Sequence, residues 1–256
     1  MEKIITLLWA PDADGDALRT RLIDVVAPAL LSRGAHAVTV NVHDAAAAEA
    51  PSPVPTPGAE LPLAAEVSVW VDAYDRWDPA EDPMRECAPL VASYLVTESL
   101  YDDYGTTPWA AARDWPDGER SRGVLTVGLI HRPAGLDYAE WITRWHGTQS
   151  PVSGEIQPRT RYVRNEVVRA LTPDAPEVHG IVEEAWPSAG HVADPELFFN
   201  APGDPDLMQA NVQTMMDSVN ACLDLERLRS ATMSEYLVRS LPGGSCPGPG
   251  SFTGRS

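Results

Sequence analysis

The sequence predicts an α+β protein of tandem ferredoxin-like repeats, with two antiparallel sheets facing each other in an α+β barrel. Two observations predict this fold. The expected elements of the first half follow the order strand–helix–strand–strand–helix–strand, which is the ferredoxin-like unit, and the second half repeats that order. A ferredoxin-like sheet carries helices on one face only, so its bare face needs a partner sheet. Two copies in one chain can therefore enclose a cavity.

The first repeat, residues 1–103, begins with a strand, because residues 3–9 are rich in β-branched and apolar side chains. A helix is expected over 15–31, where apolar residues such as Leu18 and Leu22 recur at helical spacing. The other elements expected in this repeat are strands at 37–42, 67–71 and 94–101, with a short helix at 84–91.

The second repeat, residues 123–240, begins with a strand over 124–131. A helix over 137–149 follows, and its apolar side chains fall at i, i+3, i+4 and i+7. Asp204 caps a later, long helix whose first position is Pro205. Three further strands are expected at 161–170, 181–186 and 230–238.

The two repeats align without a gap when residues 1–42 are shifted forward by 123 positions. Asp14 then falls on Asp137, and Pro28 falls on Pro151. Few identities survive, but the order and spacing of the elements agree with the same offset. We therefore expect an internal repeat.

Three segments are predicted to connect or extend the repeats. Residues 104–122 are polar, contain prolines and lie near the middle, so they are expected to be a linker. Residues 44–64 contain a series of prolines and are expected to form a surface loop. Residues 241–256 are mostly Gly, Pro and Ser, which predicts a disordered tail.

Composition excludes several classes of function. The net charge of −18 disfavours nucleic acid and anionic membranes as partners. The three cysteines are far apart, and the N-terminus lacks the features of a signal peptide, so we expect a cytoplasmic protein. Nucleotide-binding, serine-hydrolase and metal-ligand motifs are absent, so no cofactor and no metal is expected. The expected partner is a small apolar or aromatic molecule, and the chain is expected to be a monomer that closes its own barrel or a homodimer.

Polar candidates concentrate in the second repeat. At equivalent positions the first repeat has an apolar or small residue: Leu8 for His131, Ile23 for His146, Val26 for Gln149, Thr39 for Tyr162, Val42 for Asn165 and Ser68 for Glu184. We therefore expect the second repeat to supply the chemistry and the first repeat to supply an apolar wall.

Three motifs of the second repeat match a known family. Trp145 and Pro151 match the ends of a Trp-x-x-x-His-x-Pro pattern, the segment from Tyr162 to Asn165 resembles a strand that starts near a tyrosine, and residues 180–186 fit Gly-x-x-x-Glu-x-Trp with Glu184 as the glutamate. Over about residues 123–238 the chain resembles the EthD-like branch of the dimeric α+β barrel superfamily. The resemblance implies oxidation, decarboxylation or cyclisation of an aromatic or polyketide-like compound. Gln149 replaces the family histidine, and a neutral amide cannot shuttle a proton near pH 7.

The predicted site lies on the inner face of the second sheet. Glu184 is predicted to be a general acid or base, because one of Glu183 and Glu184 must face inward in a regular strand and apolar walls raise a carboxyl pKa. Tyr162 and Gln149 are predicted to hydrogen-bond the substrate oxygen. The residues predicted to contact the substrate are Trp186, Trp145, Trp141, Asn165, His131 and His146.

Each candidate also has a structural alternative. A hydrogen-bonded glutamate, a tyrosine in the barrel wall, a histidine that caps a strand and tryptophans in the core would explain the same residues. Two functions stay open, a cofactor-free enzyme and a catalytically silent protein that binds a small molecule. A carboxylate that touches the ligand space favours the enzyme, and a cavity of apolar groups and amides favours binding.

Overall fold

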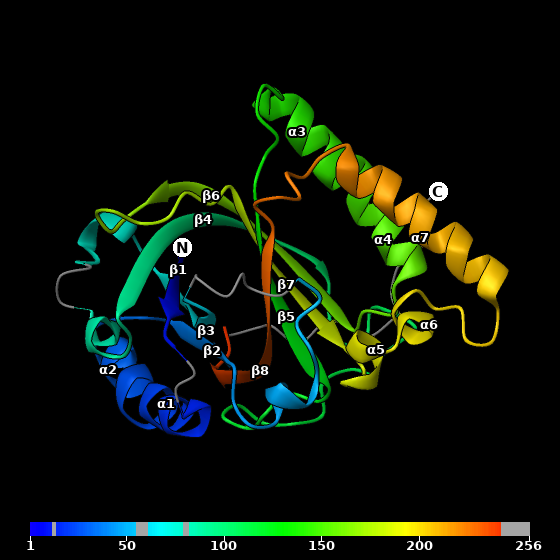
Figure 1. The fold of residues 1–256 in the computed structure, drawn as a ribbon. Coiled ribbons are helices and arrows are strands. Elements are labelled where there is room, and N and C mark those ends of the chain that lie inside the picture. Colours follow the sequence, from blue (N-terminus) through cyan, green and yellow to red (C-terminus); the bar gives the residue numbers. More distant parts are fainter. Residues whose placement is uncertain (12–13, 55–60, 79–81, 242–256) are drawn as a thin grey trace, which may run out of the picture.

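The computed structural model describes residues 1–11, 14–54, 61–78 and 82–241. Eight antiparallel strands close into one barrel, in the order β1-β3-β2-β8-β5-β7-β6-β4 (Figure 1). The predicted α+β barrel is thereby confirmed. Each half has the strand order fourth–first–third–second, and the halves join at two seams, β2 with β8 and β4 with β6. The two predicted sheets are thus parts of one continuous sheet without free edges.

All eight predicted strands are present. Those of the first half are β1 (Glu2–Trp9), β2 (Ala37–Val42), β3 (Leu63–Val71) and β4 (Leu90–Asp102). Those of the second half are β5 (Val124–Ile130), β6 (Arg161–Ala170), β7 (Gly180–Trp186) and β8 (Arg229–Arg239). Both β3 and β4 begin about four residues earlier than predicted, because these first residues already pair with β1.

Each long helix of the two halves contains a π-helical segment. In the first half α1 (Gly15–Arg21), η1 (Leu22–Val26) and α2 (Ala27–Ser32) follow one another. In the second half α3 (Tyr138–Arg144), η6 (Trp145–Gln149) and α4 (Ser150–Ile156) do the same, so this helix continues past the predicted end at 149. A proline, Pro28 or Pro151, follows each π segment. Because its ring clashes with the carbonyl four residues earlier, the turn before it must widen.

One further long helix is α7 (Pro205–Asn220). It begins as predicted, with the Asp204 side chain accepting a hydrogen bond from the backbone N–H of Leu207. The short helix predicted over 84–91 is only a 3-10 turn, η5 (Pro83–Glu86), because β4 already begins at Leu90. The other short helical elements are η2 (Ala47–Glu49), η3 (Tyr74–Arg76), α5 (Gly190–Ala193) and α6 (Pro195–Phe198).

Strand alternation creates one core inside the barrel and others outside it. The inside is filled by apolar residues of both halves, such as Ile5, Leu7 and Val127. Outside, α1 and α2 cover the sheet of the first half, whereas α3, α4 and α7 lie on another side over the second half (Figure 1). Most sheet positions therefore face either the interior or a helix layer, whereas the end of β6 reaches solvent, where Val168 is 55% exposed.

The predicted domain boundaries stay a prediction. Segment 104–122 contains a buried tyrosine, Tyr104, and pairs with β8 through Arg120. Part of the proline-rich loop, 55–60, and the tail from Pro242 onward lie outside the described residues. In the part of the chain that is described, no helix is long and apolar enough to cross a membrane.

Candidate active site at one end of the barrel

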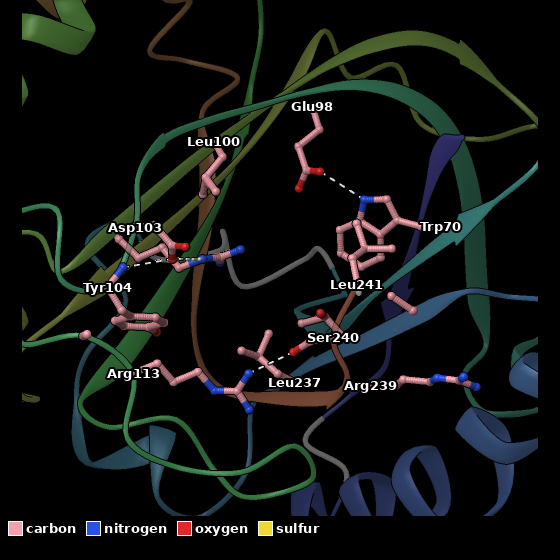
Figure 2. Close-up of a pocket in the computed structure, with 14 residues that line it drawn as sticks. Trp70, Glu98, Leu100, Asp103, Tyr104, Arg113, Leu237, Arg239, Ser240 and Leu241 are labelled. Carbon is pink, nitrogen blue, oxygen red and sulfur yellow. Dashed lines mark hydrogen bonds and ion pairs between the residues drawn. The ribbon is translucent and has the colours of Figure 1, made fainter. Parts of the chain in front are cut away.

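A cavity of about 250 Å³ opens at the end of the barrel where β1 begins. We call it the barrel-end cavity, and its walls include Trp70, Glu98, Leu100, Asp103, Tyr104 and Arg161. Figure 2 shows Glu98 and Trp70 pointing toward each other, with Asp103 and Tyr104 on another side of the space. The volume is small for a ligand pocket, so a compact molecule would fit.

Charged residues reach this end of the interior because they are in phase with inward apolar residues of their strands. Lys3 precedes Ile5 by two positions on β1, and Glu183 lies between Ile181 and Ala185 on β7. Since side chains two apart on a strand share a face, these charges point into the barrel.

Lys3 is the only lysine of the chain, and it lies in the middle of this charged region. Its Nζ donates hydrogen bonds of 2.9 Å to Glu98 and 2.9 Å to Glu183, and lies 4.8 Å from the centre of the Trp70 ring. Burial lowers the pKa of the ammonium, but the nearby carboxylates of Glu183, Glu98 and Glu66 outweigh burial and raise it. Lys3 is therefore a fixed cation shared by two carboxylates.

Arg161 is the second interior cation. Its Nη1 donates to Glu235 at 2.9 Å and lies 3.5 Å from Glu183, while Nε lies 3.5 Å from Asp103. Burial opposes the charge, but Glu235 and Glu183 outweigh it, so the guanidinium pKa is raised. The Tyr104 hydroxyl also donates to Glu235, at 2.8 Å.

Glu66 is the interior carboxyl most ready to hold a proton. Burial and the charge of Glu183 raise its pKa to about 7, although Lys3 lowers it. The side chain accepts hydrogen bonds from Ser68 at 2.5 Å and from the amide of Asn41. Asn165 donates to Glu183 in the same way, at 2.8 Å. Each half therefore contributes an Asn–Glu pair from its second and third strands.

Together these groups form a barrel charge network of two cations, Lys3 and Arg161, and the four carboxyl groups of Glu66, Glu98, Glu183 and Glu235. Burying such charges costs several kcal/mol per ion unless each is paired. Lys3 and Arg161 each pair with two of the carboxylates, Glu66 is held by hydrogen bonds, and Glu98 connects the network to the cavity wall.

The structure corrects the predicted position of three site residues. Glu184, Tyr162 and Trp186 lie on the outer face of the sheet, since the alternation of β7 places Glu183 inside. Glu184 pairs with Arg159 at 2.7 Å. The expectation that the three line an inner cavity is therefore wrong.

Tyr162 and Trp186 are both held by contacts outside the barrel. The Tyr162 hydroxyl accepts a hydrogen bond from Trp145 Nε1 at 3.3 Å. Trp186 Nε1 donates to Thr126 at 3.0 Å, and its ring stacks on Phe198 with the ring centres 4.7 Å apart. The roles predicted for these residues stay predictions.

The helix residues of the predicted set lie in the outer layer. The ring centres of Trp141 and Trp145 lie 5.0 Å apart, and Trp141 Nε1 donates to the Cys222 carbonyl at 2.9 Å. Gln149 is buried at the end of the π segment. His146 lies against Trp145, and burial together with Arg164 lowers its pKa to about 4.

Two predicted residues lie away from that layer. Asn165 faces the interior, within the charge network. His131 lines a second cavity of about 380 Å³ at the opposite end of the barrel, next to Trp9 and Leu129. Its Nε2 lies 2.7 Å from the Glu177 carbonyl, so Nε2 carries the proton. The structure thus divides the predicted set between the two ends and the outer layer.

Five charged residues of the network were not predicted from the sequence: Lys3, Glu66, Glu98, Arg161 and Glu235. A charged residue shares the face of residues two positions away, but β1 and β7 are buried on both faces, so this rule does not tell which face is inward. Among the described residues, no group of three His, Cys, Asp or Glu side chains could hold a metal ion.

No known protein family and no curated protein matches the sequence. Solved structures do match. One is an anthrone oxidase-like protein, with a TM-score of 0.53 and 12% identity over 93% of this chain and 94% of that chain. Another, named "Putative monooxygenase", from Fusobacterium nucleatum subsp. nucleatum, has a TM-score of 0.44 and 5% identity over 93% of this chain and 92% of that chain. The first likeness shows the fold and nothing about activity.

Proposed function

We propose that this protein is a small-molecule enzyme that binds a compact aromatic or polyketide-like substrate in the barrel-end cavity, with Glu98 as its acid–base group. One observation carries the proposal. Glu98 lines the cavity and shares the Lys3 ammonium with the buried Glu183. A carboxylate that touches the ligand space favours an enzyme over a protein that only binds.

The charge network can take up a proton at low cost. When Glu98 removes a proton from an enolisable or phenolic substrate, its carboxylate becomes neutral, but Lys3 stays paired with Glu183. An unpaired buried ammonium would be strongly unfavourable, and this transfer does not create one. Negative charge that develops on the substrate would face Arg161, a cation in the same cavity wall.

The other walls suit a flat, largely apolar molecule. Trp70 and Tyr104 offer ring surfaces, and Leu100 and Leu237 add aliphatic contacts. A proton transfer at Glu98 would serve a cofactor-free oxidation with dioxygen as the oxidant, a cyclisation or a decarboxylation. These are the reactions implied by the resemblance of the second half to the EthD-like branch, and membership of that branch is part of the proposal.

Binding without catalysis is the second candidate, and one observation favours it. Both Glu98 oxygens already accept hydrogen bonds, Oε1 from Lys3 at 2.9 Å and Oε2 from Trp70 at 3.0 Å. A carboxylate held in this way could serve only to shape the cavity.

The test is turnover of a panel of small hydroxy- and keto-substituted aromatics, beginning with anthrone because of the similar fold of the anthrone oxidase-like protein. Oxygen uptake and product absorbance are measured for the wild type, Glu98→Gln and the exposed control Glu119→Gln. We expect Glu98→Gln to lower turnover by about 10²-fold or more, the usual range for a lost general base, while binding persists. Glu119→Gln should match the wild type.

Two outcomes contradict the proposal. Wild-type turnover by Glu98→Gln would show that Glu98 is not the base. Binding of the panel without any product, with binding lost in the cavity-filling variant Thr39→Trp, would establish the binding alternative instead.

A further inference from the structure

A second polar cluster lies outside the barrel, between β6 and the α3–η6–α4 helix. We call it the helix-side arginine site, and it consists of Arg159, Arg164 and His146. Arg159 precedes β6, Arg164 lies on β6 and His146 lies in the π segment η6. π-helical segments are often found at functional sites, because they redirect side chains from a regular helix face.

The two guanidinium groups are buried but incompletely paired. Arg159 is 1% exposed and uses Nη1 for Glu184, while its Nε and Nη2 have no partner among the described residues. Arg164 is 8% exposed and uses Nη2 for Ser99, while its Nε and Nη1 likewise have no partner in the described chain. The Nε2 atom of His146 is also buried without a hydrogen-bond partner among the described residues.

Tyrosine rings hold both guanidinium groups in place. The Arg159 Cζ lies 3.9 Å from the centre of the Tyr162 ring, and the Arg164 Cζ lies 4.6 Å from that of Tyr101. The two ring centres are 5.8 Å apart, and burial together with the charge of Arg159 lowers the pKa of Arg164, so the two cations lie close together. Tyr101 is 38% exposed, whereas the Arg164 that it contacts is buried.

A ring face does not replace hydrogen-bond acceptors. A buried charged donor without an acceptor is among the most costly groups in a protein, and in native structures such groups usually have a water or ion partner. Guanidinium forks match the paired oxygens of carboxylate and phosphate groups. The cluster therefore has the donors that an oxyanion requires.

We propose that Arg159 and Arg164, with His146 beside them, bind the carboxylate or phosphate group of a small molecule. Two carboxyl groups face the site, Glu184 on β7 and Asp102 on β4. Glu184 pairs only with Arg159, and no carboxylate of the described chain lies within ion-pair distance of Arg164. Arg164 is thus the cation available to the ligand.

Gly154 on α4 packs over the cluster. A Cβ atom there would lie 3.8 Å from Arg159 Nη2 and 3.8 Å from the Tyr101 ring, so this position lies directly over both groups. The site is separate from the barrel-end cavity, because Arg164 lies on the outer face of β6 and Arg161 on the inner face. The proposal is therefore independent of the proposed function.

The test is calorimetric titration of the full chain with inorganic phosphate and with benzoate, at an ionic strength held constant with sodium chloride. We expect at least one of the two anions to bind. Arg164→Met should raise the Kd of that anion by roughly 10- to 100-fold, the range for a lost hydrogen bond to a charged group. The benzoate and phosphate titrations distinguish the two ligand classes.

Two matched controls locate the binding. Arg169→Met removes an exposed arginine of the same strand, and Arg239→Met removes one from the barrel-end cavity. Each should change Kd by less than about twofold. Binding that is lost in Arg239→Met but kept in Arg164→Met would overturn the proposal, as would the absence of binding by both anions.

Arg164→Met should fold, since no carboxylate loses its partner; circular dichroism checks this. If it does not fold, Arg164→Lys takes its place. Lysine keeps the charge but loses the planar fork, so the Kd should still rise. An unchanged Kd in Arg164→Lys would then overturn the proposal.

Discussion

Lys3 shows how much one residue can determine inside this barrel. It is the only lysine in a chain with net charge −18, and its ammonium lies in the interior, where its removal would leave two carboxylates without their shared partner. Such a loss typically costs about 3–5 kcal/mol of stability. In the proposed reaction the same ammonium would allow Glu98 to become neutral, so stability and the proposed chemistry would depend on one side chain.

Lys3 should resist amine-specific acetylation in the folded chain. Its Nζ is buried, hydrogen-bonded and held protonated by neighbouring carboxylates, and only the unprotonated amine reacts. Mass spectrometry after brief treatment with acetic anhydride should find modification at the α-amine of Met1 in buffer, and at both amines in urea. Equal rates at the two amines in buffer would contradict the position of Lys3.

At the scale of elements, one sequence offset aligns the helices of the two halves but does not align the faces of their first strands. The offset of 123 residues relates the buried helix positions Leu18 and Leu22 to Trp141 and Trp145, and it relates the two π segments to each other. The same offset places Lys3, which faces inward, on Thr126, which faces outward. The alignment of the first strands therefore differs from that of the helices by an odd number of residues, and an odd shift reverses the face of a strand.

Two glycines of the second half should respond oppositely to alanine. Gly180 lies on β7, where a Cβ would be 2.8 Å from both Ile130 and Trp145, so Gly180→Ala should destabilise the protein by about 1–3 kcal/mol through overpacking. Gly147 lies in η6 with nothing within 4 Å, so Gly147→Ala should stabilise it by about 0.5–1 kcal/mol. Urea unfolding measures both, and a stabilising Gly180→Ala would contradict the packing of the helix on β7.

For the whole molecule, closure of the barrel makes the two halves depend on each other. The interior core contains residues of both, and the seams β2–β8 and β4–β6 pair every outer strand. Either half alone would expose an apolar sheet face and two strand edges.

The full chain should accordingly unfold in one transition, with fluorescence and circular dichroism coincident. Residues 1–103 and 123–256, expressed separately, should not unfold cooperatively as monomers. Analytical ultracentrifugation with urea titration checks this. A monomeric half with its own cooperative transition would show that the halves are independent domains.

The sequence by itself determined the order of the elements, the helix faces and the pairing of two α+β halves in one barrel. Helix positions were predictable because apolar residues recur at 3.6-residue spacing on one face only, as Trp141 and Trp145 do. Strand β7 gives no such signal. Its residues are buried on both faces, so Glu183 and Glu184 are equivalent in the sequence, and only the tertiary structure decides between them.

Which glutamate faces inward depends on the elements that pack against each face of β7. Helices α3 and α4 cover the side of Glu184, and the strands across the barrel enclose the side of Glu183, where Lys3 meets it from a position 180 residues earlier in the chain. No local pattern in β7 encodes that contact. Which carboxylate enters the barrel, and with which cation, is therefore set by closure of the sheet, because closure brings β1 and β7 to face the same interior.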